Sequence, residues 1–152
     1  MRIAMSALFC KLGLAAFGGT AARADDKPDI KVEFKKFEGA WTFESVEAGG
    51  KEVPAAEFKR ITVTFEGDRY TVKKGDEVIQ AATQKLDPSK SPKTLDVTVA
   101  EGPHQGVVML GIYEISGDTL KVCFDPEGKK RPTQFKSASG SQTLVVHKRV
   151  KK

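Results

Sequence analysis

Short runs of alternating apolar and polar residues, separated by turn residues, fill most of this chain. In one run Ile61, Val63 and Phe65 alternate with two threonines and a glutamate, which is the period of a strand with one buried face. Pairs such as Gly67-Asp68 and Gly75-Asp76 separate neighbouring runs and are typical of hairpin turns. We therefore predict eight strands, over residues 41–47, 61–66, 70–72, 78–86, 95–99, 107–115, 120–124 and 143–149.

The order of these strands along the chain favours a closed barrel. Consecutive hairpins produce an antiparallel meander, and closing it removes the two edges that would otherwise expose unpaired backbone groups. Residues 87–92, with two prolines, interrupt the pattern as a loop, and one helical turn is expected over residues 54–59. The sequence thus predicts a single all-β domain over residues 39–150, an eight-stranded antiparallel up-and-down barrel.

The first 24 residues have the composition of a secretory signal peptide. Arg2 and Lys11 precede the apolar run 12–17, and Ala22-Arg23-Ala24 places small residues at the last and third-last positions. That run is much shorter than the roughly 20 residues that cross a bilayer, so we expect cleavage of residues 1–24 and no membrane insertion. Residues 25–38 are charged and are expected to form a lead-in segment, its apolar side chains on the domain surface. The protein is accordingly expected to be exported, to the periplasm or the cell exterior.

Cleavage would also change the charge and cysteine content. Residues 1–24 hold three cations and no acid, so their removal lowers the formal net charge from +5 to +2. A nucleic-acid-binding role, which needs a concentrated basic face, gains no support from that balance. The remaining chain keeps one cysteine, Cys123, so it forms no internal disulfide and its stability must come from the core.

Several longer motifs resemble a known family. Gly39-Ala40-Trp41 resembles the start of the first strand in lipocalin-like barrels, and Lys85-Leu86-Asp87-Pro88, Gly111-Ile112-Tyr113-Glu114 and Gly117-Asp118-Thr119-Leu120-Lys121 are similar to a lipocalin-like domain that is abundant in Planctomycetes. The resemblance covers essentially the whole chain after residue 24. It implies a β-barrel of the lipocalin (calycin) kind and, by distant analogy, ligand binding, and it transfers no catalytic residue. A shared fold alone does not define a function.

The same resemblance suggests how the barrel is closed. In lipocalin-like barrels the indole of the Gly-x-Trp motif fills the closed end, and a cation from the last strand packs on it. Gly39, Trp41 and Arg149 are therefore the expected closure residues, with Lys148 as a second choice of cation. A guanidinium over an indole contributes roughly 0.5–2 kcal/mol, depending on burial.

The barrel interior is the expected place for a ligand. An eight-stranded barrel is either filled by its own side chains or holds one small molecule. The predicted inward face is crowded with bulky residues from Phe43 to Phe124, so both possibilities stay open. If a pocket exists, the expected ligand-binding residues are Tyr70, Gln84, Met109 and Tyr113.

No residue cluster points to catalysis or to a metal or cofactor. A reactive thiol at Cys123 would need a base nearby, and neither His104 nor His147 has supporting spacing, so we expect Cys123 to be covered and both histidines to lie on the surface. The run Lys129-Lys130-Arg131 fits either an anion- or partner-binding loop or, more simply, a solvated turn.

The sequence predicts a non-catalytic binding protein with a small apolar ligand. The alternative is a protein-interaction or inhibitor module with a filled barrel and a binding loop over residues 125–131.

Overall fold

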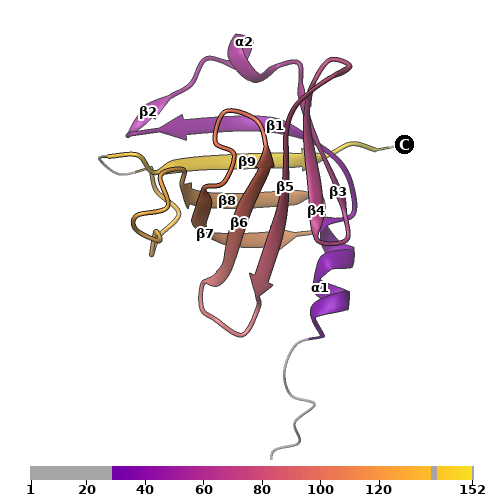
Figure 1. Ribbon diagram of the computed structural model, residues 1–152, viewed down its shortest axis with the longest axis vertical. Helices are drawn as coiled ribbons and strands as arrows, with labels where there is room; N and C mark the ends of the chain where they lie inside the picture. Colours follow the sequence, from indigo (N-terminus) through magenta and orange to yellow (C-terminus); the bar gives the residue numbers. More distant parts are fainter. Residues whose placement is uncertain (1–28, 138–139, 152) are drawn as a thin grey trace, which may run out of the picture.

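The computed structural model describes residues 29–137 and 140–151, and the predicted signal peptide lies outside them. Figure 1 shows one strongly curved sheet that wraps around on itself, with one short helix at the lower right of the view and another at the top. The elements in chain order are α1 (Ile30–Phe37), β1 (Gly39–Ala48), β2 (Lys51–Glu52), α2 (Ala55–Phe58), β3 (Ile61–Glu66), β4 (Arg69–Lys74), β5 (Glu77–Asp87), β6 (Lys93–Glu101), β7 (Val108–Ser116), β8 (Thr119–Asp125) and β9 (Thr143–Arg149).

The sheet closes into a barrel because its first and last long strands pair. From β3 to β9 each strand is antiparallel to its neighbour in sequence, and β1 pairs with both β3 and β9. The β1–β9 ladder runs from Trp41 opposite Arg149 to Ala48 opposite Thr143, with a bulge between Phe43 and Ser45. The predicted closed antiparallel barrel of eight strands is confirmed, and the short β2 adds a two-residue hairpin partner at the end of β1.

Side-chain alternation along the strands supplies the core. On β6, for example, Leu95, Val97 and Val99 are buried while the side chains between them are more exposed. Residues that lie opposite each other on neighbouring strands point their side chains to the same face of the sheet. Each strand therefore places its inward-facing side chains beside those of its neighbours. These inward rows form one continuous cluster that also contains Phe37 from α1 and Trp41 from β1.

The segment before the barrel differs from the expectation. Its last part is α1, which begins at Asp29, whose side chain accepts a hydrogen bond from the Lys31 N–H as an N-cap. Ile30 and Val32 do lie on the surface, but Phe37 is completely buried. A surface position was therefore wrong for Phe37, because α1 turns its last residue into the barrel, and Phe34 packs partly buried against the same core.

The second helix matches the sequence prediction. Pro54 precedes α2, a single turn in which Phe58 is the buried residue. The ring of Phe58 lies near that of Phe43 on β1, with centroids 6.3 Å apart. The connection from β2 to β3 thus packs against the barrel through this one side chain.

Candidate functional site

One end of the barrel is closed by α1 and the residues around its last turn. The Trp41 indole on β1 is fully buried, and its Nε1 donates a 2.7 Å hydrogen bond to the carbonyl of Phe37. Arg149 on β9 stacks on the indole, with its guanidinium carbon 4.2 Å from the ring centroid. The predicted packing of Arg149 on Trp41 is confirmed.

Arg149 also makes hydrogen bonds to the backbone at the end of α1, which the sequence did not predict. Its Nη2 donates to the carbonyl of Lys36 and its Nη1 to that of Glu38, each at 2.6 Å. With the Trp41 bond to Phe37, three successive carbonyls at the end of α1 have side-chain donors. The last carbonyls of a helix have no partner within it, so these two barrel residues cap α1.

Gly39 permits this arrangement by its backbone conformation. Its φ of 115° lies in a region that residues with a side chain rarely adopt, and a Cβ there would point at Arg149 Nη1 from 3.5 Å. The three predicted closure residues therefore act together, as one joint between α1, β1 and β9.

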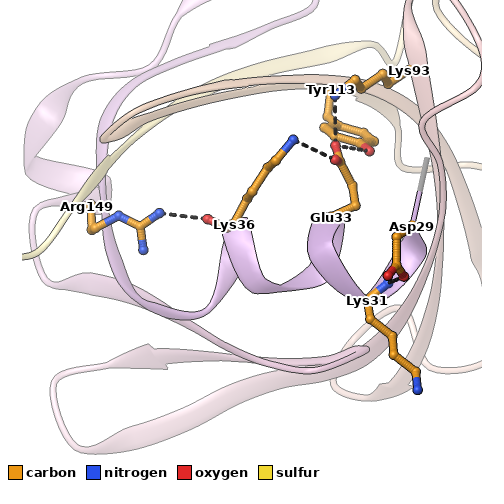
Figure 2. A network of polar contacts seen from close by, with 7 residues as sticks. All are labelled: Asp29, Lys31, Glu33, Lys36, Lys93, Tyr113 and Arg149. Atoms are coloured by element: carbon orange, nitrogen blue, oxygen red, sulfur yellow. Dashed lines mark hydrogen bonds and ion pairs between the residues drawn. The ribbon is translucent and has the colours of Figure 1, made fainter.

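A buried carboxylate fixes the middle of α1 to the barrel (Figure 2). Glu33 is 2% exposed; it accepts a 2.8 Å hydrogen bond from the Tyr113 hydroxyl and forms 2.9 Å ion pairs with Lys36 and Lys93. Burial alone would raise the pKa of Glu33, but the bonds from Lys36, Lys93 and Tyr113 outweigh it and lower the pKa. Glu33 thus stays ionised and links α1 to β6 and β7.

The position of Tyr113 differs from its predicted role. The sequence suggested that it would orient a ligand, yet its hydroxyl is bound by Glu33 and its ring packs on Phe37, with centroids 5.2 Å apart. Burial, followed by the bond to Glu33, raises the pKa of Tyr113. The described lining of the barrel cavity does not include it. Tyr113 belongs to the closed end.

Above this closed end the barrel holds a cavity of about 310 Å³. It reaches from Phe37 on α1 to His104 in the β6–β7 loop and Pro126 in the β8–β9 loop. Most of the described lining is aliphatic or aromatic, and it contains no Asp, Glu, Lys or Arg. The space is therefore suited to an apolar body without a formal charge.

Three of the four predicted ligand-binding residues line this cavity: Tyr70, Gln84 and Met109. The Tyr70 hydroxyl accepts a 3.2 Å hydrogen bond from Gln80 Nε2, and burial raises the pKa of Tyr70 to about 12, so it remains neutral. Gln84 is 5% exposed, and its Nε2 has no hydrogen-bond partner within the described residues.

His147 is a cavity residue that the sequence analysis placed wrongly. It was expected on the surface, but it is 6% exposed and lines the cavity, with its ring 4.7 Å from that of Phe43. Burial lowers its pKa to about 3, so the imidazole is neutral at ordinary pH. The strand period contained the signal, since Val145 and His147 are two apart on β9 and Val145 belongs to the core.

The outer face of β7 and β8 is covered by the β8–β9 loop. Cys123, fully buried as expected, donates from Sγ to the carbonyl of Lys136, and burial raises its pKa. Arg131 donates from Nη1 to the carbonyls of Leu95 and Gly111 and pairs with Asp96. Its guanidinium is thus engaged in holding the loop, while Lys129 pairs with Glu127 at the surface.

Comparisons with family models, with characterised proteins and with solved structures found no match to this chain. In the described part of the chain, no three His, Cys, Asp or Glu side chains gather as a metal site. Among the same residues, no helix has the length and hydropathy needed to span a membrane. The fold and the cavity define the class of protein: a closed eight-stranded antiparallel barrel with a helical plug and an internal cavity.

Proposed function

We propose that this protein is an exported, non-catalytic binding protein of the lipocalin-like class, which holds one small, mainly apolar molecule inside its barrel. The observation that carries the proposal is the cavity of about 310 Å³ above α1. Its described lining is largely aliphatic and aromatic, which is the composition of small-molecule sites. The motifs that resemble the Planctomycetes family and the signal-like first 24 residues support the class and the export.

The cavity favours this function over the interaction module with a filled barrel. An interior packed by side chains leaves few voids larger than a water molecule, whose share of liquid volume is roughly 30 Å³. The space here is larger than a single water requires, which supports a barrel whose bulky inward residues leave room for a guest. The groups at its wall, such as Met109 and Phe124, offer an apolar surface to a guest.

The test is binding of an apolar fluorescent probe, N-phenylnaphthylamine, to the chain that begins at Asp25. We expect saturable binding at one site with enhanced fluorescence. Val72→Trp, which fills the cavity from β4, should abolish the binding. Thr71→Trp is the matched control, because neighbouring residues on a strand face opposite sides of the sheet.

Native mass spectrometry of the protein from its own cells provides a second measurement, with retained small-molecule mass as the expected result. A wild-type protein that neither binds the probe nor carries such mass contradicts the proposal. So does a folded Val72→Trp variant that binds the probe as tightly as wild type, since the probe would then lie elsewhere.

A further inference from the structure

Two buried side chains that line the barrel cavity each have a nitrogen without a hydrogen-bond partner. Gln84 Nε2 and His147 Nδ1 are the two buried side-chain nitrogen or oxygen atoms in the described part of the chain that make no hydrogen bond. Both residues are more than nine-tenths buried, and both line the same cavity. Buried polar groups in folded proteins nearly always have partners, so a pair without them inside one cavity is unusual.

Another pair of polar side chains that line the cavity, Gln80 and Tyr70, does form a hydrogen bond. Gln80, four residues before Gln84 on β5, donates to the Tyr70 hydroxyl at 3.2 Å. Gln84 itself is held by its backbone, whose N–H donates to the Asp68 carbonyl at 2.7 Å. Its side-chain amide nitrogen, unlike that of Gln80, has no hydrogen-bond partner within the described residues.

The barrel topology places the two unpartnered atoms on opposite walls. Gln84 lies on β5 and His147 on β9, and four steps around the closed sheet separate these strands in either direction. The ring contact with Phe43 orients the imidazole. A molecule in the cavity therefore lies between the side chains of Gln84 and His147.

The chemistry of these groups restricts the molecule that satisfies them. An amide nitrogen only donates, so Gln84 needs an oxygen or nitrogen acceptor, whereas Nδ1 of a neutral imidazole donates or accepts according to its tautomer. Burial keeps His147 neutral by lowering its pKa to about 3, and the described lining has no Asp, Glu, Lys or Arg. An ionised ligand would lose its hydration there without gaining a counter-charge.

We infer that the cavity selects an uncharged molecule with an apolar body, a carbonyl or hydroxyl oxygen that accepts from Gln84 Nε2, and room for a second polar group at His147 Nδ1. This inference rests on the proposed function, because it requires that the cavity binds a guest at all. It adds that Gln84 and His147 determine which guest is bound. Carboxylates and amines of the same size should bind more weakly than uncharged molecules.

The experiment compares four probes that share one ring system and differ in the polar group. Calorimetric titrations of the chain from Asp25 use naphthalene, naphthol, acetonaphthone and naphthoate. We expect naphthol and acetonaphthone to bind more tightly than naphthalene, and naphthoate to bind at least about tenfold more weakly than acetonaphthone. Gln84→Leu should weaken acetonaphthone about three- to tenfold and leave naphthalene unchanged or tighter.

His147→Phe serves as the second variant, because it keeps an aromatic ring beside Phe43 and removes the unpartnered nitrogen. It should reduce the advantage of naphthol over naphthalene. The inference is overturned if acetonaphthone binds wild type no better than naphthalene, or if naphthoate binds equally well. The proposed function fails separately, if none of the four probes binds.

Discussion

Single residues in this barrel combine tasks that sequence patterns treat as separate. Arg149 was expected only as a cation over Trp41, and it also caps α1 through the carbonyls of Lys36 and Glu38. His147 was expected at the surface and lies in the cavity wall. A motif predicted the position of Arg149. The position of His147 follows from the two-residue period of β9, which also applies to polar residues.

The Trp41 joint should be among the most sensitive positions. Trp41→Ala removes a fully buried indole, its hydrogen bond to Phe37 and the surface on which Arg149 stacks. We expect a loss of about 3–5 kcal/mol in the free energy of unfolding, measured by urea denaturation. Val78→Ala at an exposed strand position is the control and should change stability by less than about 0.5 kcal/mol. A denaturation midpoint that barely moves in Trp41→Ala would contradict this role.

His147 should make the fold sensitive to mild acid. Its folded pKa is lowered by burial to about 3, whereas the unfolded value is about 6.5. Between these values the unfolded chain binds a proton that the folded chain does not, so stability falls as the pH decreases below about 6.5. At 1.36 kcal/mol per pH unit, the loss reaches about 2 kcal/mol near pH 5.

The comparison with His147→Phe isolates this contribution. Tyr70 and His104 are the other titratable groups in the described cavity lining. The lowered pKa values of Glu33 and Asp125 act only at lower pH, since such carboxylates lose their contribution below about pH 4.5. Urea titrations at about pH 7.5 and pH 5 should show the loss in wild type and less than half of it in the variant. Equal losses in both proteins would show that His147 is not responsible.

At the scale of elements, the strands were predictable and α1 was not. Most of the strands alternate with a period of two, three of the hairpin turns contain Gly-Asp, and all eight strands occur close to the expected positions. An eight-residue helix has little intrinsic stability in water, so α1 depends on contacts that are distant in sequence. Glu33 binds Lys93 and Tyr113, and no local pattern in residues 25–38 predicts these two contacts.

The attachment of α1 can be tested at Glu33. Glu33→Ala leaves the Tyr113 hydroxyl and the Lys93 ammonium without their acceptor, and we expect a loss of about 1.5–3 kcal/mol. Amide hydrogen exchange within α1 should accelerate more than exchange in β6 and β7, because a local opening becomes easier. Glu33→Gln still accepts from Tyr113 and should lie between wild type and Glu33→Ala.

Lys35→Ala is the matched control on the exposed side of the same helix and should stay within about 0.5 kcal/mol of wild type. If α1 exchanges at the wild-type rate in Glu33→Ala, the carboxylate does not hold the helix to the barrel.

For the molecule as a whole, the sequence predicted the closed sheet but left open what the barrel contains. Hydrophobic alternation determines which residues point inward, and the inward face is as bulky as expected. Whether such residues fill a barrel depends on its diameter and on how α1 plugs one end, which are tertiary properties. The cavity and its two unpartnered nitrogens therefore became visible only in three dimensions.

Closure of the barrel should make folding depend on the last strand. β9 pairs with both β1 and β8 and supplies Arg149 to the closed end, so deletion of residues 143–152 leaves two strand edges unpaired. We expect the shortened chain to lose its cooperative thermal transition in circular dichroism, and the exposed edges to promote aggregation. Adding a synthetic peptide of residues 143–152 should restore the transition in a concentration-dependent manner, because strand pairing then becomes a binding reaction.

A chain that lacks residues 151–152 alone is the control and should melt like the full chain, since β9 ends at Arg149. A cooperative transition near the wild-type temperature in the chain without β9 would mean that the remaining strands are stable as an open sheet.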